Sequence, residues 1–111
     1  MKSTKNLNLV ILESPYAGDI EENLKYARMC VADSLKRGEA PIASHLLYTQ
    51  EGILDDTIPK ERELGIRAGL AWHKVADYAV IYIDNGISKG MSEAIAKYRR
   101  ERFFFYIRTI L

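Results

Sequence analysis

The alternation of apolar runs with helical segments constrains the fold of this chain more than any other feature. Residues 7–13, 40–47 and 78–83 have the composition of strands, and each is followed by a segment with helical periodicity. A β-rich apolar run follows at residues 103–111. Strands that alternate with helices are parallel and joined by right-handed crossovers. The sequence therefore predicts one α/β domain built on a doubly wound parallel sheet of four strands.

The predicted strand order is 2-1-3-4, as in flavodoxin-like and Rossmann-like folds, with helices on both faces of the sheet. The second long helix, residues 60–76, has apolar residues on two sides. One side is expected to contact the sheet, and the other is expected to contact a second subunit. We therefore predict a homo-oligomer whose interface buries Ile66 or Leu70.

Length and composition limit the class of protein. The 111 residues suit a single domain, residues 1–111, and 48% hydrophobic residues suit a compact core. The net charge of +1 gives no electrostatic case for a nucleic acid polymer as partner. No apolar run approaches the roughly 20 residues of a membrane span, so no membrane contact is expected. Residues 1–6 are polar and lead directly into a strand, which does not resemble a signal peptide.

Cysteine and histidine usage bears on localisation and on metal binding. The single cysteine, Cys30, fits a reducing compartment, so we expect a cytoplasmic protein. The two histidines, His45 and His73, lack the Cys/His spacing of a zinc site. The sequence therefore predicts neither a metal site nor a cofactor.

The segment around the third predicted strand contains the candidate site. A polar loop, residues 84–90, follows this strand and leads into the next helix. In open parallel sheets, ligands bind outside the carboxyl ends of the strands, where the strand order reverses. A helix N-terminus at that place offers free N–H groups to an anion. We expect Asp84, Ser88 and Glu93 to gather there, beside residues 14–19 that follow the first strand.

Three segments resemble the nucleoside 2-deoxyribosyltransferase-like superfamily. They are VILESPYAGD after the first strand, ASHLL after the second, and ADYAVIYIDNGISKGMSEAIAKY around the third. The resemblance covers residues 9–98 and is closest to uncharacterised bacterial and phage members, through the segments SPYAGD and SKGMSE of this chain. In the enzymes of this superfamily, a glutamate on the helix after the third strand attacks the anomeric carbon. The resemblance implies that Glu93 is the nucleophile and that Asp84 protonates the base or binds sugar hydroxyls.

The same resemblance implies the substrate and the residues that bind it. The ligand would be a nucleoside, a nucleotide or a nucleotide-derived small molecule, and the reaction would cleave or transfer its N-glycosidic bond. The expected substrate-binding residues are Ser14, Pro15, Tyr16, Gly18, Asp19, His45, Asn85, Ser88, Gly90 and Met91.

Two roles remain open for Glu93, and with them two functions. Glu93 is either the nucleophile or the capping-box carboxylate of a helix that begins at Gly90. The characterised enzymes tend to place the glutamate two residues after a glycine, whereas Glu93 follows Gly90 by three. One residue rotates a helical side chain by roughly 100°. This spacing favours a non-catalytic protein that binds or sequesters an ADP-ribose-like molecule, whereas the carboxylate pair of Asp84 and Glu93 favours an enzyme.

Arg62 and Glu63 lie on the second long helix, where a neighbouring subunit would have to complete a pocket for them to reach a ligand. Charged residues on a helix surface are usually solvated. We therefore expect both side chains to face solvent.

Overall fold

The computed structural model describes residues 7–111. It contains one parallel sheet of four strands in the order β2-β1-β3-β4, so the predicted fold class and strand order are confirmed. The prediction that residues 1–6 are not a signal peptide lies outside the described residues. The strands are β1 (Asn8–Glu13), β2 (Glu39–Ile42), β3 (Tyr78–Tyr82) and β4 (Phe105–Arg108).

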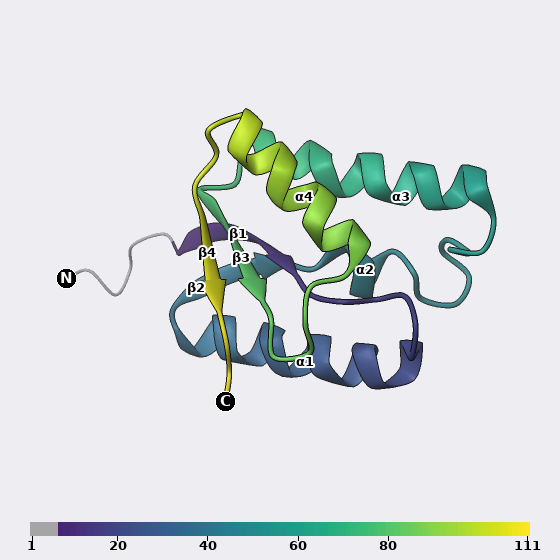
Figure 1. Cartoon of the computed structure of the whole chain (residues 1–111), viewed down its shortest axis with the longest axis horizontal. Helices are drawn as coiled ribbons and strands as arrows, with labels where there is room; N and C mark the ends of the chain where they lie inside the picture. Colours follow the sequence, from purple (N-terminus) through teal and green to yellow (C-terminus); the bar gives the residue numbers. More distant parts are fainter. Residues whose placement is uncertain (1–6) are drawn as a thin grey trace.

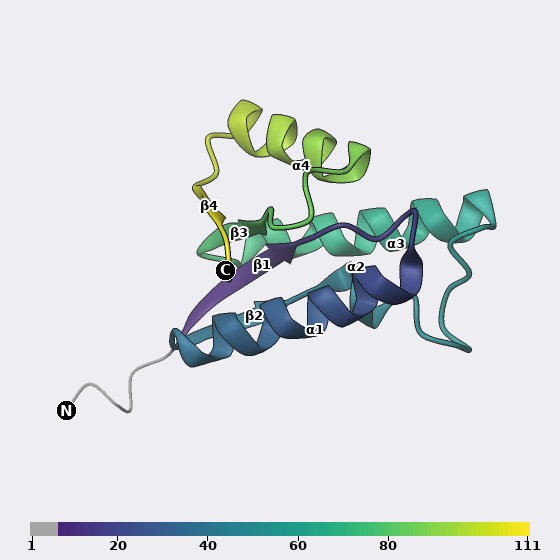
Figure 2. The same ribbon diagram turned by 60° about the horizontal axis from the view of Figure 1, so that its bottom comes forward.

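Helices cover both faces of the sheet, as predicted. Figure 1 and Figure 2 show α1 (Ile20–Lys36) on one face, and α3 (Pro59–Ala71) and α4 (Lys89–Arg100) on the other. Two shorter elements complete the connections: α2 (Ser44–Leu47) follows β2, and a 3₁₀ turn, η2 (Trp72–Lys74), follows α3. None of the helices within residues 7–111 is long and apolar enough to cross a membrane.

Two clusters of buried side chains hold the layers together. Successive strand residues point to opposite faces, so Val10 packs against Tyr26 and Cys30 of α1, while Ile11 belongs to the cluster beneath α4. The members of that second cluster are Ile11, Ala79, Ile81, Met91, Ile95 and Tyr98.

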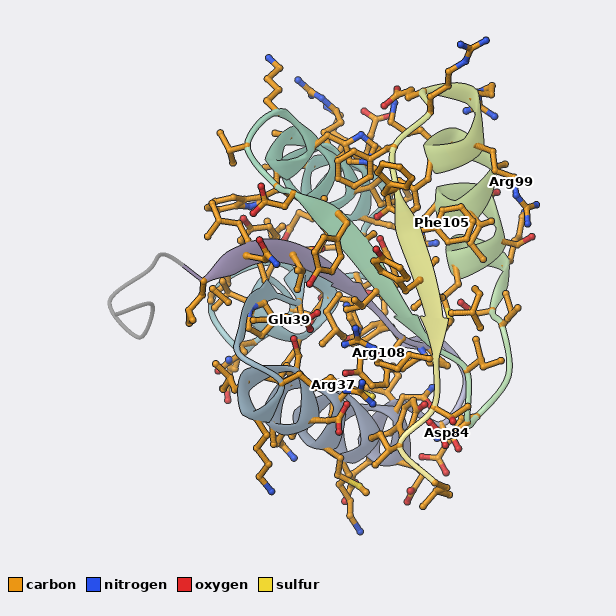
Figure 3. All side chains as sticks on the ribbon, turned by 90° about the vertical axis from the view of Figure 1, so that its left-hand side faces the viewer. Arg37, Glu39, Asp84, Arg99, Phe105 and Arg108 are labelled. Atoms are coloured by element: carbon orange, nitrogen blue, oxygen red, sulfur yellow. The ribbon has the colours of Figure 1, made fainter. Side chains whose placement is uncertain are left out.

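A polar network joins the two edge strands on the face covered by α1 (Figure 3). Arg108 of β4 donates two hydrogen bonds to the carboxylate of Glu39 in β2, over 2.8 and 3.1 Å. The hydroxyls of Ser34 and Tyr78 donate to the same carboxylate over 2.7 and 2.5 Å. Glu39 is 5% exposed, so these donors replace the water that its charge loses on burial.

The structure corrects the boundaries of the second predicted strand. Residues 40–47 were expected to form the second strand and its exit, but β2 already ends at Ile42 and residues 44–47 form a helical turn. The backbone N–H groups of Leu46 and Leu47 donate to the Ala43 carbonyl, which starts this turn. Periodicity does not separate a buried strand from a short helix in an apolar run of this length.

The helix predicted at residues 60–76 divides into α3 and η2. Ile66 and Leu70, which are predicted to lie at a subunit interface, line a cavity, and Ile66 is about half exposed. Leu64 and Val75, on the other apolar stripe, are about half exposed. The homo-oligomer stays a prediction.

Candidate functional site

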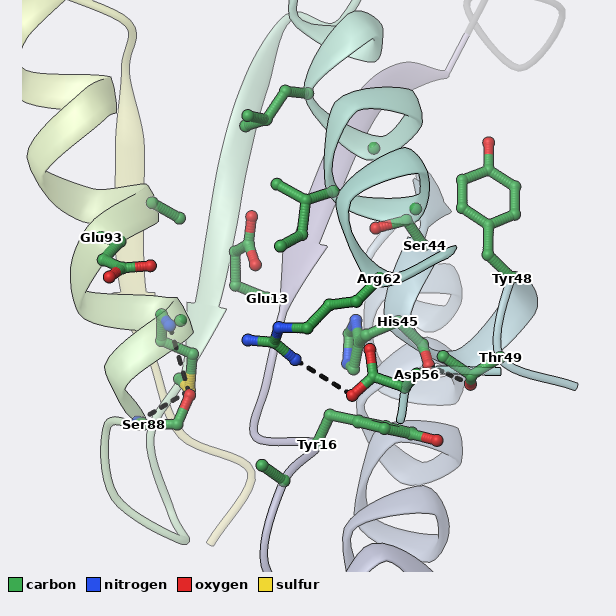
Figure 4. Close-up of a pocket in the computed structure, with 18 of the residues that line it drawn as sticks. Glu13, Tyr16, Ser44, His45, Tyr48, Thr49, Asp56, Arg62, Ser88 and Glu93 are labelled. Atoms are coloured by element: carbon green, nitrogen blue, oxygen red, sulfur yellow. Dashed lines mark hydrogen bonds and ion pairs between the residues drawn. The ribbon is translucent and has the colours of Figure 1, made fainter. Parts of the chain in front are cut away.

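A cavity of about 540 Å³ opens beyond the carboxyl end of β1, between α3 and α4 (Figure 4). Small-molecule sites have volumes of roughly 300–1,000 Å³. The position is the switch point of the sheet, where a ligand is expected. Among the polar residues that line the cavity are Glu13, Ser14, His45, Asp56, Arg62 and Glu93.

The structure brings most of the predicted site residues to this cavity. Those that line it are Ser14, Tyr16, His45, Ser88, Gly90, Met91 and Glu93. Those that do not are Pro15, Gly18, Asp19, Asp84 and Asn85. Gly18 and Asp19 start α1 instead: Gly18 has a φ of +98°, and the Asp19 carboxylate accepts the Glu22 N–H over 3.1 Å.

Asp84, the second predicted catalytic residue, is engaged elsewhere. Its carboxylate accepts hydrogen bonds from the Tyr26 hydroxyl over 2.5 Å, from the Ile110 N–H over 3.0 Å and from the Leu111 N–H over 3.1 Å. The hydrogen bond from Tyr26 is the main reason that the pKa of Asp84 lies below its usual value. Asp84 therefore ties the end of β3 to α1 and to the segment after β4, and the structure does not bring it together with Glu93.

The N-terminus of α4 is capped by Ser88, not by Gly90. The Ser88 hydroxyl accepts the Met91 N–H over 3.2 Å, and the Met91 sulfur lies 3.4 Å from the Ser88 nitrogen. Glu93 lies beyond these capping positions, so the prediction that it is the capping-box carboxylate is wrong. Its side chain is exposed and lines the cavity, and Figure 4 shows it directed toward the space between α4 and α3.

Ser14 and His45 form a hydrogen-bonded pair in the cavity wall. Ser14 Oγ lies 2.6 Å from Nε2 of His45, and Ser14 is 4% exposed. Burial lowers the pKa of His45 to about 4, so its imidazole is neutral at pH 7. The pair adds a hydroxyl and an uncharged ring to the cavity, rather than a cation.

Glu13 is a site residue that the sequence analysis missed. It ends β1 and lines the cavity. Burial raises its pKa to about 7, although a hydrogen bond from the Tyr98 hydroxyl, 2.5 Å from Oε2, partly offsets this effect. The signal in the sequence is that Glu13 ends the first predicted strand, where parallel sheets bind ligands.

Arg62 is a second lining residue that was not predicted: its side chain is 47% exposed, as expected, but it also borders the cavity. It lines the cavity from α3, and its Nη1 donates to Asp56 Oδ2 over 3.0 Å. Glu63, by contrast, is exposed and does not line the cavity, as expected. The other cationic residues of the lining are Lys89, Lys97 and Arg100.

Within residues 7–111, no three His, Cys, Asp or Glu side chains are grouped so that they would hold a metal ion. The polar groups that line the cavity include carboxyl groups, hydroxyls, the neutral imidazole of His45 and cationic side chains.

Comparisons with known proteins give a family but no activity. Neither the curated proteins nor the solved structures yielded a match to this chain. One family model matches residues 8–108, which includes all four strands and every cavity-lining residue. Its description is a domain of unknown function, and on this match the chain belongs to the DUF7768 family.

Proposed function

We propose that the protein binds a nucleoside or nucleotide in this cavity and cleaves or transfers its N-glycosidic bond. Glu93 is the nucleophile and Glu13 is the acid. The observation that carries the proposal is that two carboxyl groups in different environments line one cavity. Glu13 has a pKa raised to about 7 by burial, whereas Glu93 is exposed. Glycosyl transfer through a covalent intermediate uses such a pair, one group protonated and one ionised.

The reaction balances with these two groups and water. A Glu93 oxygen attacks the anomeric carbon, and the bond from that carbon to the base nitrogen breaks. The electron pair leaves with the base, which takes the proton from Glu13. Water then attacks the same carbon, gives a proton to the Glu13 carboxylate and releases Glu93 from the sugar. If a second base replaces water, the outcome is transfer instead of hydrolysis.

Three further observations support the proposal. The cavity volume suits a ligand of nucleotide size. The first turn of α4 lines the cavity, so its N-terminal dipole favours an anionic ligand there. Glu13 supplies the acid that the resemblance assigned to Asp84, which is held by Tyr26 and the backbone after β4. The resemblance to the nucleoside 2-deoxyribosyltransferase-like superfamily motivates the choice of bond.

A non-catalytic binder is the second candidate. Asp84 does not line the cavity, and this favours a non-catalytic binder, because the pair of Asp84 and Glu93 was the feature that pointed to catalysis. In this function the cavity binds or sequesters a nucleotide-derived, ADP-ribose-like molecule, and Glu93 contacts the ligand without forming a bond.

The test is chromatography of nucleosides and nucleotides incubated with the wild type and with two variants. Glu93→Gln keeps the shape of the side chain but removes the nucleophile, so base release or exchange should fall to background. Glu13→Gln should slow the reaction by about 10²–10⁴-fold, the usual contribution of a general acid. Glu63→Gln is the matched control, since Glu63 is exposed and lies outside the cavity.

The outcomes separate the two functions. Full activity of Glu93→Gln eliminates Glu93 as nucleophile. Absence of turnover, together with a ligand-dependent rise in melting temperature, identifies the binder. A ligand at 100 times its dissociation constant stabilises by about 2.7 kcal/mol, which such an assay resolves.

A further inference from the structure

An ion pair lies in the wall of the cavity. Arg62 projects from the first turns of α3, and Asp56 lies in the segment that precedes this helix. Their Nη1 and Oδ2 atoms are 3.0 Å apart, and both residues line the cavity. Figure 4 shows the guanidinium reaching from α3 into the space that Glu13 and Glu93 also face. Arg62 is thus a cation in the wall of the cavity that the two proposed catalytic carboxyl groups also line.

The ion pair engages only one of the N–H donors of the Arg62 guanidinium among the described residues. Arginine presents five N–H donors in a planar fork that suits two parallel hydrogen bonds to a carboxylate or phosphate. Within residues 7–111, the side chain of Arg62 makes one hydrogen bond, to Asp56. Its remaining donors are available to a second acceptor in the cavity.

The contact between Arg62 and Asp56 is also weak enough to exchange. The side chains are 47% and 26% exposed, and exposed ion pairs contribute little to stability. The segment around Asp56 is fixed by other bonds. Asp55 accepts the Thr57 N–H over 2.9 Å, and its own N–H donates to Glu61 over 2.7 Å. Arg62 can therefore leave Asp56 without unfolding this segment.

The other cationic residues of the lining are less suited to this role. Lys97 is held by Glu101, with 2.6 Å between Nζ and Oε2. Lys89 and Arg100 lie at the two ends of α4, the helix that also contains Glu93. Arg62 is on the opposite wall, facing Glu93.

We infer that Arg62 is a specificity-determining residue that binds a phosphate ester on the substrate, and that Asp56 is the carboxylate which this phosphate displaces. The inference rests on the proposed function, because a nucleotide is the proposed substrate whose anionic group is a phosphate. Arg62 therefore selects nucleoside monophosphates over nucleosides. Asp56 then acts as a competitor that weakens the binding of every such ligand.

The test measures dissociation constants by calorimetry for common nucleosides, their 5′-monophosphates and inorganic phosphate. The wild type should bind a monophosphate at least about tenfold more tightly than its nucleoside, as a charge-assisted hydrogen bond allows. Arg62→Met should abolish this difference and leave the affinity for the nucleoside unchanged. Asp56→Asn should tighten monophosphate binding, which the loss of a merely structural ion pair would not do.

Arg67→Met is the matched control, because Arg67 lies on the same helix, is exposed and does not line the cavity. An unchanged preference for the monophosphate in Arg62→Met overturns the inference and leaves the proposed function standing. If the wild type binds free phosphate as tightly as a nucleoside monophosphate, Arg62 binds phosphate alone, and the inference that it binds a phosphate ester of the substrate is overturned. If no nucleoside and no monophosphate binds, the inference and the proposed function fail together.

Discussion

At the base of the cavity, the Tyr98 hydroxyl donates to Glu13 over 2.5 Å. Tyr98 is fully buried, and its ring packs against His73 and Phe103. A hydrogen bond to the ionised form lowers the pKa of a carboxyl group, so Tyr98→Phe should raise the pKa of Glu13 above about 7, by roughly one unit. A titration of ¹³C-labelled glutamate followed by NMR measures this shift.

The control for this prediction is Tyr106→Phe, since the Tyr106 side chain is half exposed on β4. In the activity assay, Tyr98→Phe should also move the alkaline limit of the pH profile to higher pH. A Glu13 pKa that stays the same or falls in this variant would show that Tyr98 does not stabilise the ionised carboxylate.

At the scale of single residues, the sequence predicted many of the residues that line the cavity, but not the contacts of Glu13 and Asp84. Ser14 and Glu93 follow predicted strands, and this was sufficient to place them at the switch point. The pKa of Glu13 depends on burial and on Tyr98, which is 85 positions away in the chain. Asp84 is occupied by backbone groups 26 and 27 positions away. Neither set of contacts leaves a pattern in the neighbouring sequence, so Glu13 was not predicted to line the cavity and Asp84 was.

At the scale of elements, α2 and α3 approach each other at a glycine. A Cβ atom on Gly69 would lie 2.5 Å from Ser44 Oγ and 3.1 Å from Ser44 Cβ, which is too close for a packed structure. Gly69→Ala should therefore push α3 away from α2 and destabilise the fold by about 1–3 kcal/mol, as overpacking does. Urea unfolding measures this difference.

Gly90→Ala is the matched control, because a Cβ atom there meets nothing within 4 Å. Alanine is the better helix former by up to about 1 kcal/mol, so this variant should be at least as stable as the wild type. Equal stabilities of Gly69→Ala and the wild type would show that Ser44 or α3 can shift to accommodate the added methyl group without cost.

Helices and strands were predictable from the sequence where their apolar residues repeat with a clear helical or strand period. The apolar stripe of α1 and the buried run of β3 are long enough to be assigned from sequence. The turn α2 has only four residues, and it forms because the chain must leave β2 and reach the α3 face. That requirement belongs to the assembled sheet and does not appear in residues 44–47 alone.

At the scale of the whole molecule, Glu13 and Glu39 make stability depend on pH in opposite directions. Burial alone would raise the pKa of Glu39, but hydrogen bonds from Arg108, Tyr78 and Ser34 outweigh it and hold the pKa at about 2. Glu39 should therefore stabilise the fold above pH 4.5, with this contribution lost as the pH falls toward 2. Glu13, whose folded pKa is raised to about 7, should destabilise the fold as the pH rises from 4.5 to 7.

The sign follows from proton counts. Between pH 4.5 and 7, the folded chain keeps the Glu13 proton that the unfolded chain has lost, so raising the pH favours unfolding. Unfolding free energies are measured from pH 2.5 to 7.5. His45, whose folded pKa is lowered to about 4, makes stability rise with pH up to about 6.5, which offsets the effect of Glu13 in the wild type. The unfolding free energy of Glu13→Gln minus that of the wild type should therefore increase as the pH rises from 4.5 to 7. Glu39→Gln should flatten the lower part of the wild-type curve. A difference between Glu13→Gln and the wild type that stays constant from pH 4.5 to 7 would contradict the raised pKa of Glu13.

The bond between Arg108 and Glu39 has a mechanical consequence. Edge strands normally fray one at a time, because each is held by a single neighbour. Here the guanidinium of β4 and the carboxylate of β2 share two hydrogen bonds across the central pair of strands. If either edge opens, a buried charge on the other edge loses its counter-ion. The two borders of the sheet are therefore expected to open as one cooperative unit, although no backbone hydrogen bond of the ladder connects them directly.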